Sequence, residues 1–398
     1  MRTTQTASNT LIKKINKSLV FETIKLKGPI SRAEVAKQRG LNKATVSKMV
    51  TELIEESFVK EMGEGQSTGG RKPIMLYFNQ NAGYSIGIDL GVNYITGILT
   101  DLNGNIIERT QINLFSTNFE KVLRNINKII ENLKNSSPPS PYGIVGIGIG
   151  VPGQINQNGD ILFAPNLDWH HINLREKIEK KHLIPVEVVN EANAGAHGEH
   201  MLGVGKNIKN QIYISIGIGI GTGIIINHNL YEGSFGTSGE MGHFSINAEG
   251  RKCSCGSKGC WELYASEGAL LSLALETNII DNKQSFDLNV LLAKAKKGDS
   301  AVLKILEELG ENIGYGLVNI INTFDPEIIT IGNRIVQFQH WIAPPINKVL
   351  QERITNDNKL NTEIRFSILK DNAITLGVNL FAISTFLEKH QLQMSYLN

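Results

Sequence analysis

Residues 84–101 read Tyr-Ser-Ile-Gly-Ile-Asp-Leu-Gly-Val-Asn-Tyr-Ile-Thr-Gly-Ile-Leu-Thr-Asp and predict two apolar strands joined by a turn. Two later apolar runs, 144–149 and 211–216, also end in glycine-containing turns, at 150–153 and 217–223. Helical patterns lie between and after these strands, at about 119–134 and 373–388. Strands that alternate with helices predict an α/β fold with a mostly buried sheet.

The composition is that of an ordinary globular protein. The chain has 398 residues, 41% of them hydrophobic, and its 40 Lys and Arg nearly balance its 38 Asp and Glu. This length predicts two or three compact units, and the composition excludes collagen-like, coiled-coil and disordered classes. Glycine is the unusual component, with 39 residues concentrated in short runs after apolar stretches, as in turns that bind phosphates or sugars.

Charge is distributed unevenly along the chain. Residues 1–82 carry 14 Lys and Arg against 7 Asp and Glu, and the remainder carries 26 against 31. A basic head joined to an acidic body indicates binding to nucleic acid or to a membrane surface. We find neither an N-terminal signal-peptide pattern nor an apolar run near the roughly 18 residues of a membrane span. The sequence therefore predicts a cytoplasmic protein without a membrane partner.

The basic head has the pattern of a winged helix-turn-helix. Apolar residues recur at helical spacing over 9–27, and Ser31 with Glu34 forms a capping box for a short second helix. A turn at Gly40 leads to a third helix at 43–56. Two apolar stretches, 58–59 and 74–78, then flank a glycine-rich basic loop, as the strands of a wing would.

A winged helix-turn-helix would bind DNA through the polar side of its third helix and through its wing. The expected DNA-binding residues are Ser31, Arg32, Asn42, Lys43, Thr45, Ser47, Lys48, Arg71 and Lys72. Arg71 is suited to a narrow minor groove, which attracts guanidinium groups. The alternative is a small helical protein-binding module with a solvated lysine-rich face.

The three cysteines predict a metal site. Cys253, Cys255 and Cys260 lie within eight residues, and His243 lies ten residues upstream. Three thiolates and one imidazole suit a closed, structural zinc site, with no position left for a catalytic water. Such an ion would orient the loops expected to carry Glu240 and Glu262. The alternative is three unligated thiols in a reducing compartment.

The order of motifs in the body resembles the ROK family of repressors, open reading frames and sugar kinases. The motifs are the Asp-x-Gly turn at 89–91, Gly-Val-Pro-Gly at 150–153, Asn-x-Ala-Asn at 190–193, Glu-x-Gly-His at 240–243 and the cysteine cluster. The resemblance covers about 84–388. It implies an actin-like, ATPase-type domain of two lobes at 81–398, behind a DNA-binding domain at 1–80. Lobe one would comprise about 84–195 plus the helix at about 373–390, and lobe two about 196–372.

The same resemblance implies a sugar-binding pocket between the lobes. Its expected residues are Gly153, Asn166, Asn190, Glu191, Glu240, His243 and Glu262. Carboxylates and amides suit a ring of hydroxyl groups, and they would reject analogues that lack those hydroxyls. Considered singly, each acid could equally be a surface or helix-capping residue. His243 would contact sugar through one ring nitrogen and zinc through the other.

The positions that a sugar kinase needs for ATP and for catalysis are altered. Glu191 stands where the kinases carry Asp, Val92 follows Gly91 where backbone must approach phosphate, and Ile218 replaces a frequent Thr. The final glycine turn is replaced by Gly332-Asn333-Arg334. We therefore expect no catalytic residues and no bound ATP.

The sequence thus predicts a homodimeric repressor that binds operator DNA and is released by a sugar. The resemblance is strongest to family members that respond to D-xylose, which makes D-xylose the expected inducer. One alternative is an ATP-dependent sugar kinase with an accessory DNA-binding head. Another is a constitutive DNA-binding protein with a vestigial sugar fold.

Overall fold

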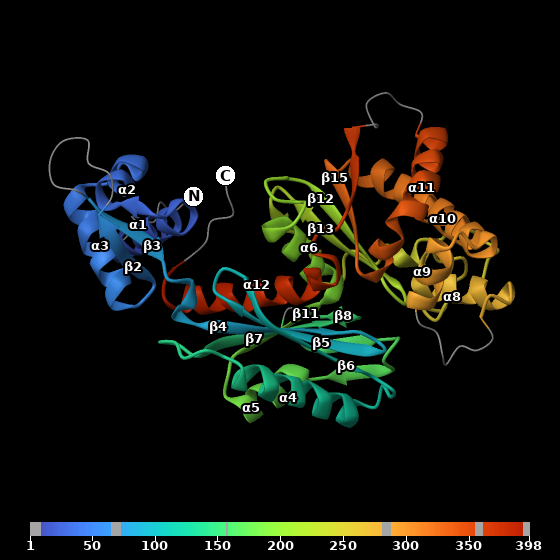
Figure 1. Ribbon diagram of the computed structural model, residues 1–398, viewed down its shortest axis with the longest axis horizontal. Helices are drawn as coiled ribbons and strands as arrows, with labels where there is room; N and C mark the ends of the chain where they lie inside the picture. Colours follow the sequence, from blue (N-terminus) through green and yellow to red (C-terminus); the bar gives the residue numbers. More distant parts are fainter. Residues whose placement is uncertain (1–8, 65–72, 157, 281–287, 355–360, 393–398) are drawn as a thin grey trace, which may run out of the picture.

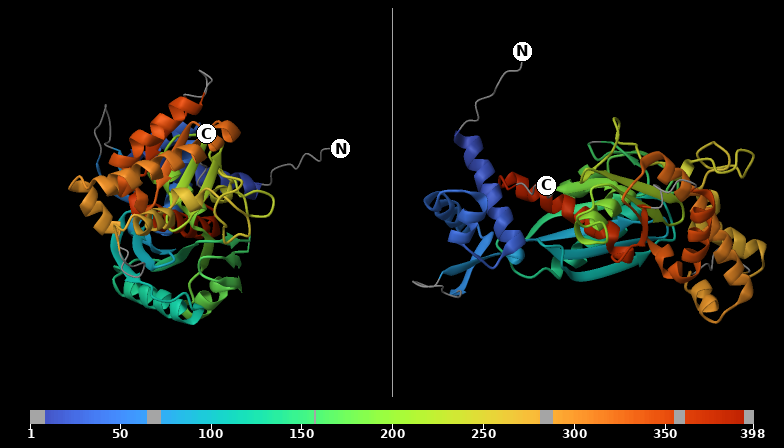
Figure 2. Two further views of the ribbon diagram at one scale, coloured as in Figure 1. Left: turned by 90° about the vertical axis from the view of Figure 1, so that its right-hand side faces the viewer. Right: turned by 90° about the horizontal axis from the view of Figure 1, so that it is seen from above.

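The computed structural model describes residues 9–64, 73–156, 158–280, 288–354 and 361–392. An N-terminal head lies at one end of the molecule, beside two lobes built around separate sheets (Figure 1). Two helices lie between these sheets, and further helices cover the outer faces (Figures 1 and 2). Among the described helices, none combines the length and apolar character that a membrane span requires.

The head consists of three helices and a small antiparallel sheet of order β1-β3-β2. Ser31 caps the second helix by accepting a hydrogen bond from the backbone N–H of Glu34, and Gly40 ends that helix in the left-handed conformation. Phe21, Phe58 and Phe78 pack edge-on in the core of the head. Its elements are α1 (Asn9–Lys27), β1 (Ile30–Ser31), α2 (Arg32–Arg39), α3 (Lys43–Glu55), β2 (Val59–Glu64) and β3 (Ile74–Phe78).

The first lobe is built on a five-stranded sheet of order β11-β7-β4-β5-β6. Its strands are β4 (Tyr84–Leu90), β5 (Tyr94–Asp101), β6 (Ile106–Asn113), β7 (Ile144–Val151) and β11 (Val186–Asn190). The outer helices are α4 (Phe119–Asn135) and α5 (Leu174–His182), and a small sheet comprises β8 (Gln154–Ile155), β9 (Ile161–Ala164) and β10 (Trp169–Ile172). The 3₁₀ helix η1 (Gln80–Ala82) joins this lobe to the head.

The second lobe repeats this strand arrangement in a sheet of order β14-β13-β12-β15-β16. In each sheet, the first three strands along the chain pair antiparallel in succession. Two later strands then extend the sheet in parallel from the other edge of the first strand. The strands are β12 (Gln211–Ile216), β13 (Ile220–Ile226), β14 (Asn229–Leu230), β15 (Ile328–Gly332) and β16 (Glu363–Phe366). The turns β4–β5 and β12–β13 therefore occupy equivalent places in the two lobes.

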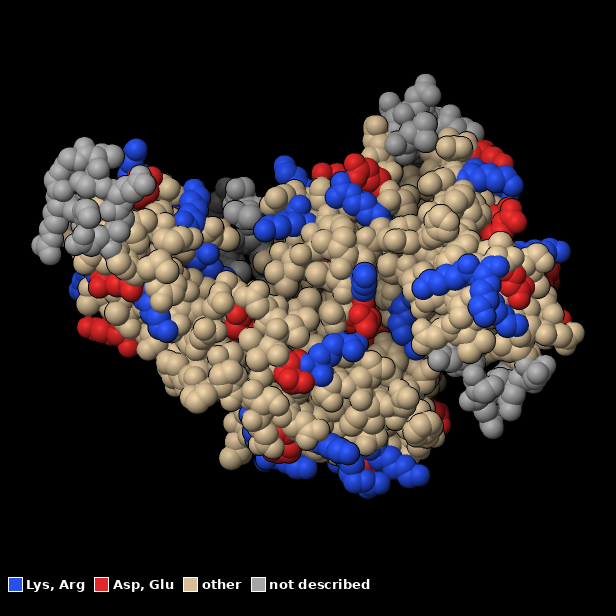
Figure 3. All heavy atoms as spheres, in the orientation of Figure 1, with Lys and Arg blue, Asp and Glu red and all other residues tan. Residues whose placement is uncertain are grey.

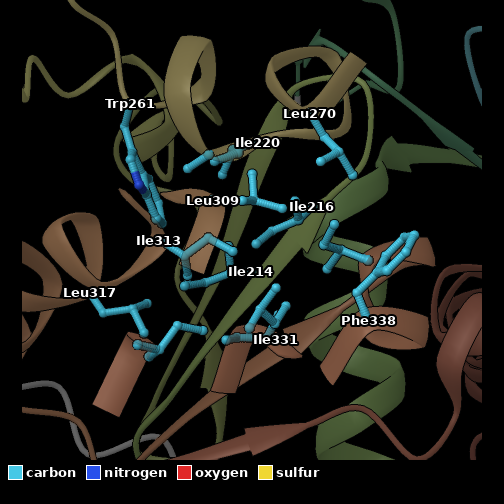
Figure 4. Packing of buried hydrophobic residues seen from close by; sticks show 14 of the residues in the cluster. Ile214, Ile216, Ile220, Trp261, Leu270, Leu309, Ile313, Leu317, Ile331 and Phe338 are labelled. Carbon is cyan, nitrogen blue, oxygen red and sulfur yellow. The ribbon is translucent and has the colours of Figure 1, made fainter. Parts of the chain in front are cut away.

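Helices cover the outer face of the second sheet. They are α7 (Glu262–Ala265), α8 (Glu267–Glu276), α9 (Leu288–Lys296), α10 (Ser300–Phe324) and α11 (Gln339–Arg353). In the described part of the second lobe and its connection to α12, the 3₁₀ helices are η2 (Met241–His243), η4 (Arg334–Phe338) and η6 (Lys370–Asn372). Ile214, Ile216 and Ile331 of the sheet pack against Leu309, Ile313 and Leu317 of α10 in the core (Figure 4).

The two inner helices, α6 (Glu191–Leu202) and α12 (Ala373–Lys389), cross each other between the sheets. Glycine makes their close approach possible. A Cβ on Gly377 would lie 1.8 Å from the carbonyl oxygen of Ala194, and one on Gly198 would lie 2.3 Å from that of Ala373. Gly148 on β7 likewise leaves room for the backbone of Val378. The crossing therefore tolerates only glycine at these positions.

Candidate functional site

A cavity of about 160 Å³ lies between the two lobes, bordered by both of the equivalent turns. All seven residues that the sequence predicts for sugar binding line it: Gly153, Asn166, Asn190, Glu191, Glu240, His243 and Glu262. They come from different elements, and the fold brings them together over a sequence separation of more than one hundred residues. Carboxylates, amides and glycine backbone dominate its polar surface, which suits a small, neutral, hydroxyl-rich ligand.

Asn190 has a structural task at this cavity. Its side-chain oxygen accepts hydrogen bonds from the backbone N–H groups of Ala192 and Asn193, at 2.8 and 3.1 Å, and thereby caps α6. Its amide nitrogen donates to the carbonyl oxygen of Gly153 at 2.9 Å. Asn190 thus fixes the start of α6 against the 150–153 turn, and so holds Glu191 and Gly153 on one wall.

Glu191 is the first residue of α6 and directs a carboxyl group toward the cavity. Burial raises the pKa of Glu191 to about 8, and the negative charges of Asp89 and Glu267 act in the same direction. Burial also raises the pKa of Asp89 to about 7. A raised pKa favours the protonated carboxyl, which can both donate hydrogen bonds to hydroxyl groups and accept them.

Asn166 and Glu262 approach each other from opposite sides of the cleft at Gly219. A Cβ on Gly219 would lie 2.7 Å from Glu262 Oε2 and 3.6 Å from Asn166 Nδ2. Glycine at position 219 therefore leaves room beside the β12–β13 turn for both an amide of the first lobe and a carboxylate of the second. The expectation that Glu262 lies on a loop is wrong, because Glu262 is the first residue of α7.

His243, Cys253, Cys255 and Cys260 form a cluster at the rim of the cavity, and their ligand atoms all lie within 4.8 Å of one another. Cys253 Sγ is 3.7 Å from His243 Nδ1, and Cys255 Sγ is 3.6 Å from Cys260 Sγ. A zinc tetrahedron with metal–sulfur bonds of about 2.3 Å has edges of about 3.8 Å. The four residues therefore fit a tetrahedral metal ion.

The two nitrogens of His243 face different groups. Nδ1 points to the cysteine cluster and lies 3.5 Å from Glu262 Oε1, whereas Nε2 lies 3.9 Å from Glu240 Oε2. The imidazole thus lies between the metal-ligand cluster and the carboxylate at the cavity. This arrangement is consistent with the expectation that one nitrogen binds metal while the other faces the ligand.

Trp261 anchors the cysteine segment in the core of the second lobe (Figure 4). The indole is fully buried and donates a hydrogen bond from Nε1 to the carbonyl oxygen of Asn312 at 2.8 Å. Its backbone N–H also donates to the carbonyl oxygen of Phe244 at 2.7 Å, beside His243. Because Trp261 lies between Cys260 and Glu262, this anchor fixes a metal ligand and a cavity acid together.

The predicted DNA-binding residues of the head differ in exposure and in whether they already have partners within the head. Lys43 and Lys48 on α3 are exposed, as is Asn42, which also caps α3; Thr45 and Ser47 are half-buried. Arg32 donates to the carbonyl oxygen of Ser47 and pairs with Glu61, and Ser31 caps α2, so both already have partners within the head. Arg71 and Lys72 lie outside the described residues.

Several residues that line the cavity were not predicted from the sequence, among them Asn93, Tyr94, Gln154 and Phe163. Arg334, which the sequence marks only as a departure from a glycine turn, also lines the cavity. Tyr94 follows the Asp89–Gly91 turn by three residues and has its ring over Gly91. An aromatic residue three positions after a glycine turn was the available signal. Its orientation toward the cavity depends on the tertiary structure.

A scan against protein-family models matches residues 85–385 to the ROK family. This chain belongs to the ROK family. It is 44% identical to the xylose repressor of Bacillus subtilis over 96% of this chain and 98% of that protein. Family membership and the two-lobed architecture support an actin-like, sugar-kinase-type fold.

Solved ROK structures of two kinds are similar to this one. The crystal structure of a ROK transcriptional regulator, a homologue of the Escherichia coli Mlc protein, matches with a TM-score of 0.78 and 26% identity over 96% of this chain and 98% of that one. The structure of a ROK glucokinase from Streptomyces griseus, in complex with glucose and AMPPNP, matches with a TM-score of 0.69 and 28% identity. This match covers 75% of the present chain and 98% of the glucokinase chain. The regulator match thus extends to nearly the full chain, and the kinase match does not.

The raised pKa of Glu191 predicts a pH-dependent stability. The folded chain keeps a proton on this carboxyl up to about pH 8, whereas an unfolded glutamate loses it near pH 4.3. The stabilisation from the protonated Glu191 carboxyl is complete below the pKa of glutamate in the unfolded chain. It is lost as the pH rises through the pKa of Glu191 in the folded chain. We expect Glu191→Gln to flatten the decline of the sugar-free melting temperature between pH 5 and 8. Glu249→Gln, at an exposed site, is the control; equal slopes in both variants and the parent would contradict the assignment.

Replacement of a cysteine in the cluster tests the metal site. Cys255 is exposed, so Cys255→Ser removes one ligand with little change in packing. We expect bound zinc to fall from about one equivalent to a small fraction and the melting temperature to drop by about 5 °C or more. Ser257→Ala, on the same loop, should keep its zinc. Metal analysis and calorimetry on the purified variants measure both effects, and a zinc-free parent protein would refute the site.

Proposed function

We propose that this chain is a sugar-responsive transcriptional repressor, with D-xylose as its inducer. The observation that carries the proposal is full-length similarity: the B. subtilis xylose repressor aligns with 96% of the chain, head included. The S. griseus glucokinase aligns with only 75% of the chain while its own length is almost fully covered. The head is therefore an addition to the kinase-like body, as a regulator requires.

The head is proposed to be a winged helix-turn-helix that binds operator DNA, and the chain to divide into a DNA-binding domain at 1–80 and a sugar-binding domain at 81–398. Three helices, an antiparallel sheet and the order of these elements support this interpretation. Exposed Asn42, Lys43 and Lys48 lie at the N-terminal half of α3, the part of a recognition helix that enters the major groove. On the face shown in Figure 3, basic and acidic residues are interspersed over the head and over both lobes.

The sugar is proposed to bind in the cavity between the lobes. Glu191, Glu240, Glu262 and Asn166 would supply hydrogen bonds to its hydroxyls, while Asn190 holds one wall in place. A zinc ion bound by His243, Cys253, Cys255 and Cys260 would be structural and would fix the opposite wall. The sugar and the zinc would share His243.

We propose that the protein does not phosphorylate its sugar. Glu191 carries one methylene more than the aspartate expected of a kinase, and the Tyr94 ring covers Gly91 in the first glycine turn. Arg334 lines the cavity where a glycine is expected and is held there by Glu267. The Tyr94 ring and the Arg334 side chain would hinder the binding of a nucleotide beside these turns.

The structure offers a route from the sugar to the head through α6 and α12. Glu191 begins α6 at the cavity, α6 crosses α12, and the C-terminal end of α12 packs against the head. There Phe58 of the head stacks on Tyr142 at 5.3 Å and contacts Phe386 of α12 at 5.9 Å. Tyr142 also donates a hydrogen bond from its hydroxyl to the carbonyl oxygen of Glu56 at 2.8 Å.

Sugar binding is proposed to close the cleft and, through this route, to change the orientation of the heads in a homodimer. Two heads must match two half-sites spaced by whole turns of DNA, so a small rotation lowers operator affinity. Coupling free energies of about 1–3 kcal/mol change affinity by about 5- to 150-fold.

An operator gel shift titrated with xylose, glucose and N-acetylglucosamine tests the repressor function. We expect xylose to weaken operator binding by about 5- to 150-fold, and Lys48→Ala to weaken sugar-free binding and reduce its salt slope by about one. Lys304→Ala, an exposed lysine of the second lobe, is the control. If none of the three sugars altered binding, the sensor function would be refuted, and sugar-dependent consumption of ATP would favour the kinase alternative.

Removal of the aromatic contact between head and body should uncouple the two. We expect Tyr142→Ala to keep sugar affinity within about twofold but to reduce the effect of xylose on operator affinity about tenfold. Tyr142→Phe retains the ring contacts and loses only the hydrogen bond to Glu56, so it should keep most of the response. Calorimetry with sugar and gel shifts with operator measure the two quantities, and an undiminished response in Tyr142→Ala would exclude this route.

A further inference from the structure

Four residues beside the cavity form a continuous chain of contacts: Glu267, Arg334, Tyr94 and Asp89, of which Tyr94 and Arg334 line the cavity. Arg334 donates from Nε to Glu267 Oε1 at 3.1 Å and from Nη2 to the other carboxylate oxygen. Its guanidinium lies over the Tyr94 ring, 5.1 Å from the centroid. The Tyr94 hydroxyl donates to Asp89 Oδ2 at 2.9 Å. We call this set the clasp.

The clasp connects the two lobes across the cavity. Asp89 lies on β4 and Tyr94 begins β5, so both belong to the first lobe. Glu267 begins α8, and Arg334 follows β15 in η4, so both belong to the second. The contact between Arg334 and the Tyr94 ring is the step that crosses the cleft, so separation of the lobes would break it.

Both ends of the clasp are fixed by their surroundings. Glu267 has a fully buried side chain, and its backbone N–H donates to the carbonyl oxygen of Gly217 at 2.8 Å. Asn333 accepts a hydrogen bond from the Arg334 N–H and donates to Ser215 Oγ at 3.0 Å, which fixes the turn that carries Arg334. On the other side, the Tyr94 ring lies against Gly91, where a Cβ would be 2.5 Å from it.

The chemistry of the contact favours a closed cleft. A bidentate carboxylate holds the plane of the guanidinium, so its face can stack on the aromatic ring. Cation–π attraction is strongest where the cation is partly removed from water, and the Arg334 side chain is only 31% exposed. Each lobe therefore presents a pre-formed half of the contact, and little further ordering is needed to join them.

We infer that Arg334 and Tyr94 are positioning residues for the sugar site: their contact joins the two walls of the cavity and favours its ligand-binding form. Both line the cavity with Glu191, Asn166 and Glu262. The part of this inference that concerns sugar affinity rests on the proposed function. The closure itself is a property of the lobes and does not depend on which ligand binds.

Two substitutions of Tyr94 separate the role of its aromatic ring from the role of its hydroxyl group. Tyr94→Leu removes the aromatic face, whereas Tyr94→Phe retains the face and removes only the hydrogen bond to Asp89. In the sugar-free protein, we expect small-angle X-ray scattering to give a larger radius of gyration for Tyr94→Leu than for the parent, and the parent value for Tyr94→Phe. Thermal melting and bound zinc should show that both variants are folded.

Sugar affinity gives the second measurement. We expect the xylose dissociation constant from calorimetry to rise about tenfold in Tyr94→Leu, because the binding form is less populated, and less than about threefold in Tyr94→Phe. Arg334→Lys keeps the charge but loses the bidentate pair and the planar stack, so it should resemble Tyr94→Leu. The double variant should lose little more than either single one, because both remove the same contact.

The two proposals fail in different ways. Parent-like scattering and parent-like sugar affinity in Tyr94→Leu and Arg334→Lys would overturn the clasp, even if the parent responded to xylose as proposed. Absence of sugar binding by the parent would overturn the proposed function, and scattering of the sugar-free variants would then decide on the clasp. If Tyr94→Leu does not fold, Arg334→Lys alone provides both measurements.

Discussion

The crossing of α6 and α12 between the two sheets is the constraint on which the rest of the structure depends. Two helices can approach this closely only where glycine removes the side chain, and Gly198 and Gly377 do so at the point of contact. The sheets add the same kind of constraint, because Gly148 on β7 leaves room for the backbone of α12. A side chain at any of these sites would push the lobes apart and alter the cavity between them.

This crossing also connects the two ends of the molecule. The N-terminus of α6 carries Glu191 into the cavity, and the C-terminal end of α12 lies against the core of the head. A change at the cavity that moves α6 must therefore act on a closely packed partner, since such an interface has little free volume to absorb it. The aromatic group around Phe58 and Tyr142 continues this packing into the head.

The repeated strand arrangement explains why the cleft holds both the proposed sugar pocket and the clasp. Equivalent turns, β4–β5 and β12–β13, face each other because each sheet has the same order of antiparallel and parallel strands. In a kinase, such glycine turns would approach phosphate. Here the first is covered by Tyr94, and Arg334 beside the second pairs with Glu267. Tyr94 and Arg334 thus both line the cleft beside these turns.

The sequence by itself determined most of the local structure and the chemical character of the sites. Capping residues such as Ser31, the apolar strand patterns and the close spacing of three cysteines act over a few residues, so the helices of the head, the buried strands and the Cys₃His group were predictable. Tertiary structure alone decided what distant residues do together. It placed the Asn190 amide against the carbonyl oxygen of Gly153, brought Asn166 and Glu262 to one cavity, and set Arg334 over the Tyr94 ring across the cleft. These contacts join residues that lie from 37 to 240 positions apart in the sequence, and local spacing does not encode their geometry.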